Sequence, residues 1–94
     1  MTLSIKFIGA LRHGSGKTQL TFSFQKEMSL KELLSKLSQE MPKLEKTFND
    51  QNFSESRSNT LILVNCKEIS VLKGLETILN DGDEIVFIPV VHGG

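Results

Sequence analysis

The residues with the clearest chemical potential stand at the end of the sequence, which closes with Gly93 and Gly94. Glycine has no Cβ and adopts backbone angles closed to other residues, so a glycine pair can pass through a channel too narrow for side chains. A carboxylate is a poor electrophile until it forms a mixed anhydride with phosphate, and a site for that reaction must bring the carboxylate up to ATP. We therefore expect a tail that an enzyme threads and activates. The alternative is a frayed terminus without a role.

A second candidate is Gly14-Ser15-Gly16-Lys17-Thr18, which resembles the end of a phosphate-binding loop. Such a loop needs a glycine five residues before Gly16, where Leu11 stands, and it needs a helix after the Lys-Thr pair. The residues that follow alternate between polar and apolar, as in a strand. We interpret the segment as a hairpin loop.

The remaining reactive side chains favour structural explanations. Cys66 follows an apolar strand pattern and has Lys67 beside it, but neighbours in an extended chain point to opposite faces. We therefore expect a structural or merely tolerated thiol instead of a nucleophile. His13 and His92 lie far apart and lack partner ligands, so we expect no metal site.

An acidic cluster of Asp81, Asp83 and Glu84 could attract a cation. The run Asp81-Gly82-Asp83 is also typical of a tight turn that leads into a strand. Because the turn explains these residues without a metal, we prefer it.

Length and charge set further limits. Ninety-four residues make one domain, and eleven Lys and Arg residues balance eleven Asp and Glu residues. A chain without net charge has no overall positive charge to attract nucleic acids or anionic membranes, so we expect it to bind neither directly. No apolar run approaches the length of a membrane span, and no secretory signal is visible at the first residues. We expect a soluble, cytoplasmic domain that does no chemistry alone.

The first half of the chain predicts a hairpin followed by a helix. Apolar residues alternate with polar ones over 3–7 and 19–25, which favours two strands joined by the glycine-rich loop. Ser29 and Glu32 form a capping-box pattern at the start of a helix that we predict from Ser29 to about Met41. Its apolar stripe at helical spacing consists of Leu30, Leu33, Leu34, Leu37 and Met41.

The second half predicts three more strands. The pattern first indicates a long surface loop over 47–59 and then a central strand over 61–64 that is buried on both faces. A turn over 65–68 and a short return strand at Ile69 and Val71 come next. One helical turn at Leu75, Ile78 and Leu79 and a last strand over 84–88 complete the order. Pro89 should end that strand because it has no N–H to donate. One helix covering one sheet favours an α+β roll.

Strand alternation divides the sheet residues between two faces. The side facing the helix is predicted to hold Leu3, Ile5, Phe7, Ile85 and Phe87. The opposite side then holds Ile8, Val86 and Ile88, beside Ser4 and Lys6. We predict that these three apolar residues form a partner-binding surface. The alternative is that the 47–59 loop folds over them.

The segment from Asn80 to Gly94 resembles the ending of the ubiquitin-like sulfur-carrier family. That family includes the small subunit of molybdopterin synthase (MoaD), the thiamine carrier ThiS, the eukaryotic ubiquitin-related modifier and the small archaeal modifier proteins. The specific features are Asp-Gly-Asp, an apolar strand and a terminal Gly-Gly. Phe7-Ile8-Gly9-Ala10-Leu11 with Gly16-Lys17 resembles the opening of the ubiquitin-related modifier, whereas Pro89 resembles the molybdopterin type.

The resemblance implies a β-grasp (ubiquitin-like) roll over residues 1–89, with a mixed sheet of about five strands on one main helix and a flexible tail over 90–94. It also implies that an E1-like enzyme, using ATP and Mg²⁺, adenylates the Gly94 carboxylate. A sulfur donor then makes a thiocarboxylate, whose sulfur passes to a tRNA uridine or, through a sulfur-accepting enzyme, to a pterin precursor. Alternatively, a protein lysine captures the activated carbonyl in an isopeptide bond.

In this scheme Gly94 carries the reacting carbon, Gly93 lets the tail thread, and His92 is a tail contact. The chain is then a protein co-substrate and not an enzyme, and it binds no cofactor of its own. Two alternatives stay open. One is the permanent small subunit of molybdopterin synthase, and the other is a non-catalytic β-grasp interaction module with an incidental Gly-Gly.

Overall fold

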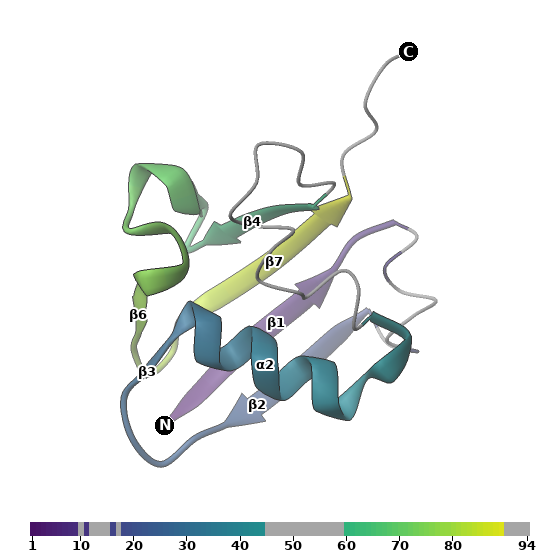
Figure 1. Ribbon diagram of the computed structural model, residues 1–94, viewed down its shortest axis with the longest axis horizontal. Helices are drawn as coiled ribbons and strands as arrows, with labels where there is room; N and C mark the ends of the chain where they lie inside the picture. Colours follow the sequence, from purple (N-terminus) through teal and green to yellow (C-terminus); the bar gives the residue numbers. More distant parts are fainter. Residues whose placement is uncertain (10, 12–15, 17, 45–59, 90–94) are drawn as a thin grey trace.

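The computed structural model describes residues 1–9, 11, 16, 18–44 and 60–89. Its main feature is a five-stranded sheet in the order β2-β1-β7-β4-β5. These strands are β1 (Thr2–Phe7), β2 (Gln19–Ser23), β4 (Thr60–Val64), β5 (Lys67–Glu68) and β7 (Glu84–Pro89). The first and last strands run parallel at the centre, and every other neighbouring pair is antiparallel (Figure 1).

The predicted hairpin is confirmed by the pairing of β1 with β2. Leu3 lies opposite Phe22, and Ile5 lies opposite Leu20. A strand, not a helix, begins right after Thr18, so the Gly-Ser-Gly-Lys-Thr run lacks the helix that a phosphate-binding loop requires. Gly14, Ser15 and Lys17 lie outside the described residues, and the strands on either side of the run pair as the hairpin interpretation requires.

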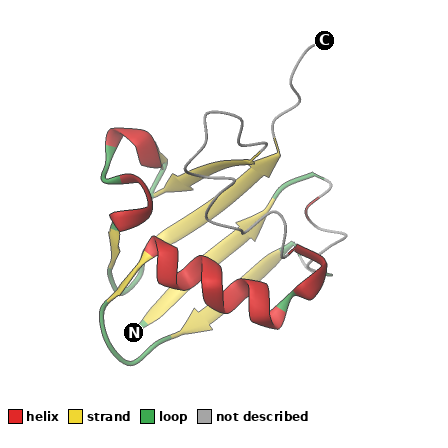
Figure 2. Cartoon of the chain, in the orientation of Figure 1, coloured by secondary structure: helices red, strands yellow, loops and turns green. Residues whose placement is uncertain are grey.

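Helix α2 (Leu30–Glu40) lies across one face of the sheet (Figure 2). It begins at the predicted capping box: the Glu32 N–H donates to Ser29 Oγ at 3.2 Å, and the Ser29 N–H donates to Glu32 Oε1 at 3.4 Å. These bonds satisfy backbone donors that the first turn of a helix leaves without partners. Met41 follows as the C-terminal cap, so the predicted bounds are confirmed.

The hydrophobic core lies between α2 and the sheet. The helix contributes its predicted leucine stripe, and β1 and β7 contribute alternate residues, as the strand pattern predicts. The fully buried members are Leu3, Ile5, Phe7, Leu30, Leu33, Leu34, Leu37, Ile62, Leu79, Ile85 and Phe87. The rings of Phe7 and Phe87 stack at the centre, with centroids 5.7 Å apart and planes 13° from parallel.

The segment after β4 differs from its prediction. The return strand is β5, inside the predicted turn, and Ile69–Val71 forms a 3-10 helix. The physical reason lies in Glu68, whose carboxylate accepts the Ser70 N–H and caps this helix, so the chain leaves the strand conformation. Ile69 is buried all the same.

The predicted helical turn at Leu75, Ile78 and Leu79 is also wrong in part. A 3-10 helix spans Gly74–Glu76, but Ile78–Leu79 forms strand β6 and pairs with strand β3 (Met28–Ser29) in a separate two-stranded sheet. This pairing joins the start of α2 to a segment far along the chain. A third 3-10 helix, Pro42–Leu44, follows α2. The predicted 47–59 loop lies outside the described residues.

Strand β4 is not buried on both faces. Ile62 and Val64 are buried against the helix side, whereas Leu61 and Leu63 are half-buried on the other side. A continuous apolar run gives no sign of how many layers cover the sheet, and α2 covers only one face.

A mixed five-stranded sheet with one helix packed across it is the β-grasp fold, as predicted. Within the described ranges, no helix has the length and apolar character needed to cross a membrane.

The capping box gives a first test of this description. We expect Ser29→Ala to lower the free energy of unfolding by about 1 kcal/mol, because the Glu32 N–H loses its acceptor, Ser29 Oγ. Ser35→Ala is the matched control, since Ser35 is exposed in the middle of the same helix. Urea unfolding followed by circular dichroism measures both, and equal stability of the two variants would contradict the role given to Ser29.

Candidate functional site

The predicted reactive tail follows directly on the last strand of the sheet. Strand β7 ends at Pro89, and the predicted site residues His92, Gly93 and Gly94 lie outside the described residues. The geometry of the site is therefore that of its base, where β7 lies between β1 and β4.

Pro89 pairs with one neighbouring strand, β4, but cannot donate a hydrogen bond to the other, β1. Toward β4 the pairing runs on to Thr60 opposite Pro89, so the strand is one residue longer than predicted. Toward β1, the Ile8 N–H donates to the Phe87 carbonyl at 3.0 Å, and the proline ring offers no N–H for the bond that would follow. The missing proline N–H therefore ends the hydrogen bonding of β7 to β1, whereas the pairing of β7 with β4 continues through Pro89.

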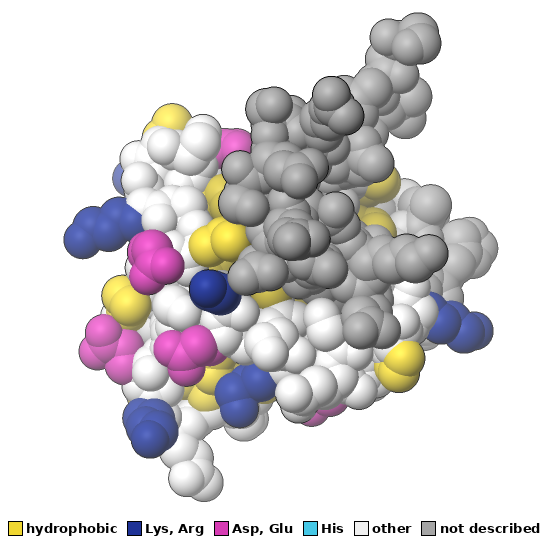
Figure 3. All heavy atoms as spheres, viewed as in Figure 1, with side chains coloured by type: hydrophobic (Ala, Val, Ile, Leu, Met, Phe, Trp, Pro, Cys, Tyr) yellow, Lys and Arg dark blue, Asp and Glu magenta, His cyan; other side chains and the backbone are white. Residues whose placement is uncertain are grey.

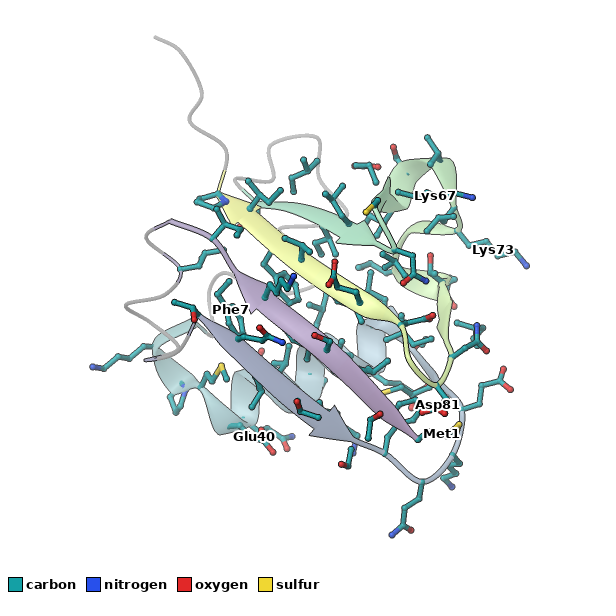
Figure 4. The ribbon with its side chains drawn as sticks, turned by 180° about the vertical axis from the view of Figure 1, so that it is seen from behind. Met1, Phe7, Glu40, Lys67, Lys73 and Asp81 are labelled. Carbon is teal, nitrogen blue, oxygen red and sulfur yellow. The ribbon has the colours of Figure 1, made fainter. Side chains whose placement is uncertain are left out.

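An apolar patch lies on the sheet face opposite α2, which we call the open face (Figure 4). The patch consists of Ile8, Leu61, Leu63, Val86 and Ile88. Ile8 is 44% exposed, and the others are half-buried. Sequence reasoning placed Ile8, Val86 and Ile88 here and missed the two leucines. The two leucines are recognised through the antiparallel register of β4 with β7, which sets Leu61 opposite Ile88 and Leu63 opposite Val86.

Polar residues border the patch on the open face. Lys6 Nζ lies 3.1 Å from Glu84 Oε2, and both side chains are well exposed, so this ion pair contributes little to stability. Gln19 Nε2 donates to Ser4 Oγ at 3.3 Å. On the opposite side of the molecule, acidic and basic side chains are intermixed on the described surface, without a large area of one sign (Figure 3).

The acidic cluster near residue 81 is structural, as preferred. Asp81 Oδ1 accepts the Thr2 N–H at 2.8 Å, and Asp83 Oδ2 accepts the Asn80 N–H at 2.8 Å. Asn65 links this turn to the next one: its Nδ2 donates to Asp83 Oδ1 at 2.9 Å, and its Oδ1 accepts the Glu84 N–H at 3.0 Å. The carboxylates thus fix two turns. Among the described residues no group of three or more His, Cys, Asp and Glu side chains could hold a metal ion.

Cys66 lies in a two-residue turn between β4 and β5, not in an extended segment. Its φ is +69°, next to Asn65 at +51°, so both residues have the left-handed conformation of a tight hairpin turn. The thiol is exposed and contributes nothing to the core. Its left-handed backbone is one that glycine adopts more readily than other residues.

Comparison with known proteins identifies the family. The family model described as the ThiS family matches residues 5–94, which is nearly the whole chain. The chain belongs to the ThiS family. A search of curated protein sequences gives no significant match.

Solved structures agree with this assignment. The small archaeal modifier protein SAMP1 from Methanosarcina acetivorans is 28% identical, with a TM-score of 0.77 over 99% of this chain and 96% of its own. Urm1 from Trypanosoma brucei is 25% identical, with a TM-score of 0.74 over 99% and 95%. SAMP1 from Haloferax volcanii, at 22% identity, shares the fold with a TM-score of 0.78 over the full length of both chains. The chain is thus a ubiquitin-like sulfur carrier or modifier by family, a class of small carrier proteins and not of catalysts.

The Cys66 turn supplies a second prediction. We expect Cys66→Gly to raise the free energy of unfolding by roughly 0.5–1 kcal/mol, because relief of the left-handed strain exceeds the added entropy of glycine in the unfolded chain. Cys66→Ala is the control, since it removes the thiol but keeps the Cβ. Thermal unfolding measures both; no gain for the glycine variant, or an equal gain for alanine, would show that strain is not the cause.

Proposed function

We propose that this chain is a cytoplasmic protein co-substrate whose Gly94 carboxylate is adenylated by an E1-like enzyme, converted to a thiocarboxylate, and used for tRNA thiolation, for isopeptide conjugation to protein lysines, or for both. The observation that carries the proposal is the ThiS-family match that runs through Gly94, five residues beyond the last described residue of a central strand. The chain supplies the acyl group, and the partner supplies the catalytic groups and the bound ATP and Mg²⁺.

The chemistry proceeds by two displacements. The Gly94 carboxylate attacks the α-phosphorus of ATP, pyrophosphate leaves, and an acyl adenylate forms. A persulfide or sulfide sulfur from a sulfur donor then displaces AMP, and a thiocarboxylate results once any persulfide bond is cleaved by a thiol reductant. If a lysine amine displaces AMP instead, the amine loses a proton and an isopeptide bond forms. Glycine at the reacting position places no Cβ beside the attacked carbonyl.

Tail length constrains where the partner binds. Five residues span at most about 17 Å when fully extended, so a site that accepts Gly94 must lie within that distance of Pro89. The partner must therefore approach the end of β7. The apolar patch lies on that strand and on its two neighbours, and we propose that the activating enzyme docks there, with Ile8, Val86 and Ile88 among its contacts.

Deletion of Gly94 tests the reacting position. N-terminally tagged chain from its native cells should carry, in its intact mass, a terminal oxygen-to-sulfur exchange, or should form a ladder of conjugates on a denaturing blot. Both should be lost when Gly94 is deleted, because the reacting carbon is then absent. Full function of the deleted chain would instead support the interaction-module alternative.

Ile88→Asp tests the docking surface. A charge in the patch must be desolvated on docking, so we expect the KM for activation to rise about tenfold or more, with circular dichroism unchanged. Thr21→Asp is the matched control, because it places the same charge on the open face at the sheet edge, away from the patch. An equal effect of both variants, or loss of folding for Ile88→Asp, would contradict the assignment.

A second candidate role is the small subunit of molybdopterin synthase, which Pro89 favours through its resemblance to that type. In this role the tail would insert into a larger permanent subunit. Co-purification of the chain with such a subunit, at a fixed ratio, separates this role from that of a free carrier.

A further inference from the structure

The parallel pairing between β1 and β7 stops at Gly9, just after β1, and Pro89, the last residue of β7. The Ser4 N–H donates to the Asp83 carbonyl at 3.0 Å, and the Ile8 N–H donates to the Phe87 carbonyl at 3.0 Å, four residues further along both strands. In a parallel ladder the next bond would run from the N–H of residue 89 to the Ile8 carbonyl. Proline at position 89 has no N–H, so this bond cannot form.

The Ile8 carbonyl has a different partner. It accepts the Leu11 N–H at 3.4 Å, and the Leu11 side chain is buried in the core. This bond closes a turn in which Gly9 has a φ of +61°. The chain after β1 therefore bends away from β7 at the residue where the ladder ends.

The space beside the Gly9 Cα is occupied by the Pro89 ring. A Cβ on Gly9 would lie 3.1 Å from Pro89 Cγ and 3.7 Å from its Cδ, and the first of these distances is tighter than an ordinary contact. Gly9 thus meets two demands at once, a left-handed backbone and a close approach to the proline ring.

We propose that Gly9 and Pro89 are positioning residues that end the β1–β7 ladder and fix the place of Pro89, the residue to which the tail is joined. The inference rests on the proposed function, because it concerns the delivery of Gly94 to the activating enzyme. Without the proline, β1 can hold residue 89 by one more hydrogen bond, and without glycine at position 9 the proline ring is displaced.

The first test is Pro89→Ala. The new N–H at residue 89 should be protected from hydrogen exchange by about fivefold, since it bonds to the Ile8 carbonyl. The KM for activation should rise about fivefold with kcat unchanged, because pairing in the free chain lowers the fraction ready to thread, and one net backbone hydrogen bond corresponds to about that factor. A variant that was only less stable would not show a raised KM together with an unchanged kcat. An unprotected amide at residue 89 would overturn the proposal.

The second test compares Gly9→Ala with Gly74→Ala. Gly74 has a similar φ of +56°, but a Cβ there would meet nothing within 4 Å. Both variants should lose stability from backbone strain, while only Gly9→Ala should also shift the NMR signals of Pro89 and Thr60 and raise the KM, because only its Cβ meets the proline ring. Equal behaviour of the two variants would overturn the role given to Gly9.

The exchange and NMR measurements need no partner enzyme, so they separate this inference from the proposed function. If the Pro89→Ala amide is protected but no enzyme activates the unmodified chain, the positioning role is supported and the proposed function is wrong. Normal activation with an unprotected amide gives the reverse result.

Discussion

The parallel pairing of the first and last strands determines most of what this molecule can do. Ile5 lies opposite Ile85 and Phe7 lies opposite Phe87, all four are buried, and the two phenylalanine rings stack under α2. Because β1 and β7 run in the same direction, the end of β7 lies at the opposite end of the sheet from the start of β1. Figure 4 shows Met1 beside Asp81, where β7 is about to begin. Pro89, to which the tail is joined, therefore lies at the end of the sheet remote from the N-terminus.

Local sequence signals predict the elements whose conformation is decided locally. Alternation gives β1 and β2, and the Ser29 and Glu32 capping box gives the start of α2. The segment after β4 could not be predicted in this way, because β6 exists through its pairing with Met28 and Ser29, far earlier in the chain. Likewise, the apolar run of β4 does not show whether one or two layers cover the sheet.

In the candidate site, too, some features depend on one segment of the sequence and others depend on strands that are distant in the chain. The Gly93-Gly94 pair stands out in the sequence because glycine next to a terminal carboxylate has few structural uses there. Leu61 and Leu63 join the patch only once the register with β7 is known. The closeness of Gly9 to the Pro89 ring cannot be seen in the sequence, since these residues stand far apart in the chain and are brought together only by the parallel pairing. Features that depend on one segment can be read from sequence, and features at the meeting of distant strands need the fold.

Sulfur transfer and conjugation share one proposed step, the activation of the Gly94 carboxylate by a partner enzyme. This step can be followed by ATP–pyrophosphate exchange by the E1-like enzyme of the same cells, with this chain as co-substrate. We expect exchange that depends on the chain, saturates with its concentration and disappears when Gly94 is removed. If an enzyme that supports exchange with another carrier gave none with the intact chain, Gly94 would not be the group that is activated.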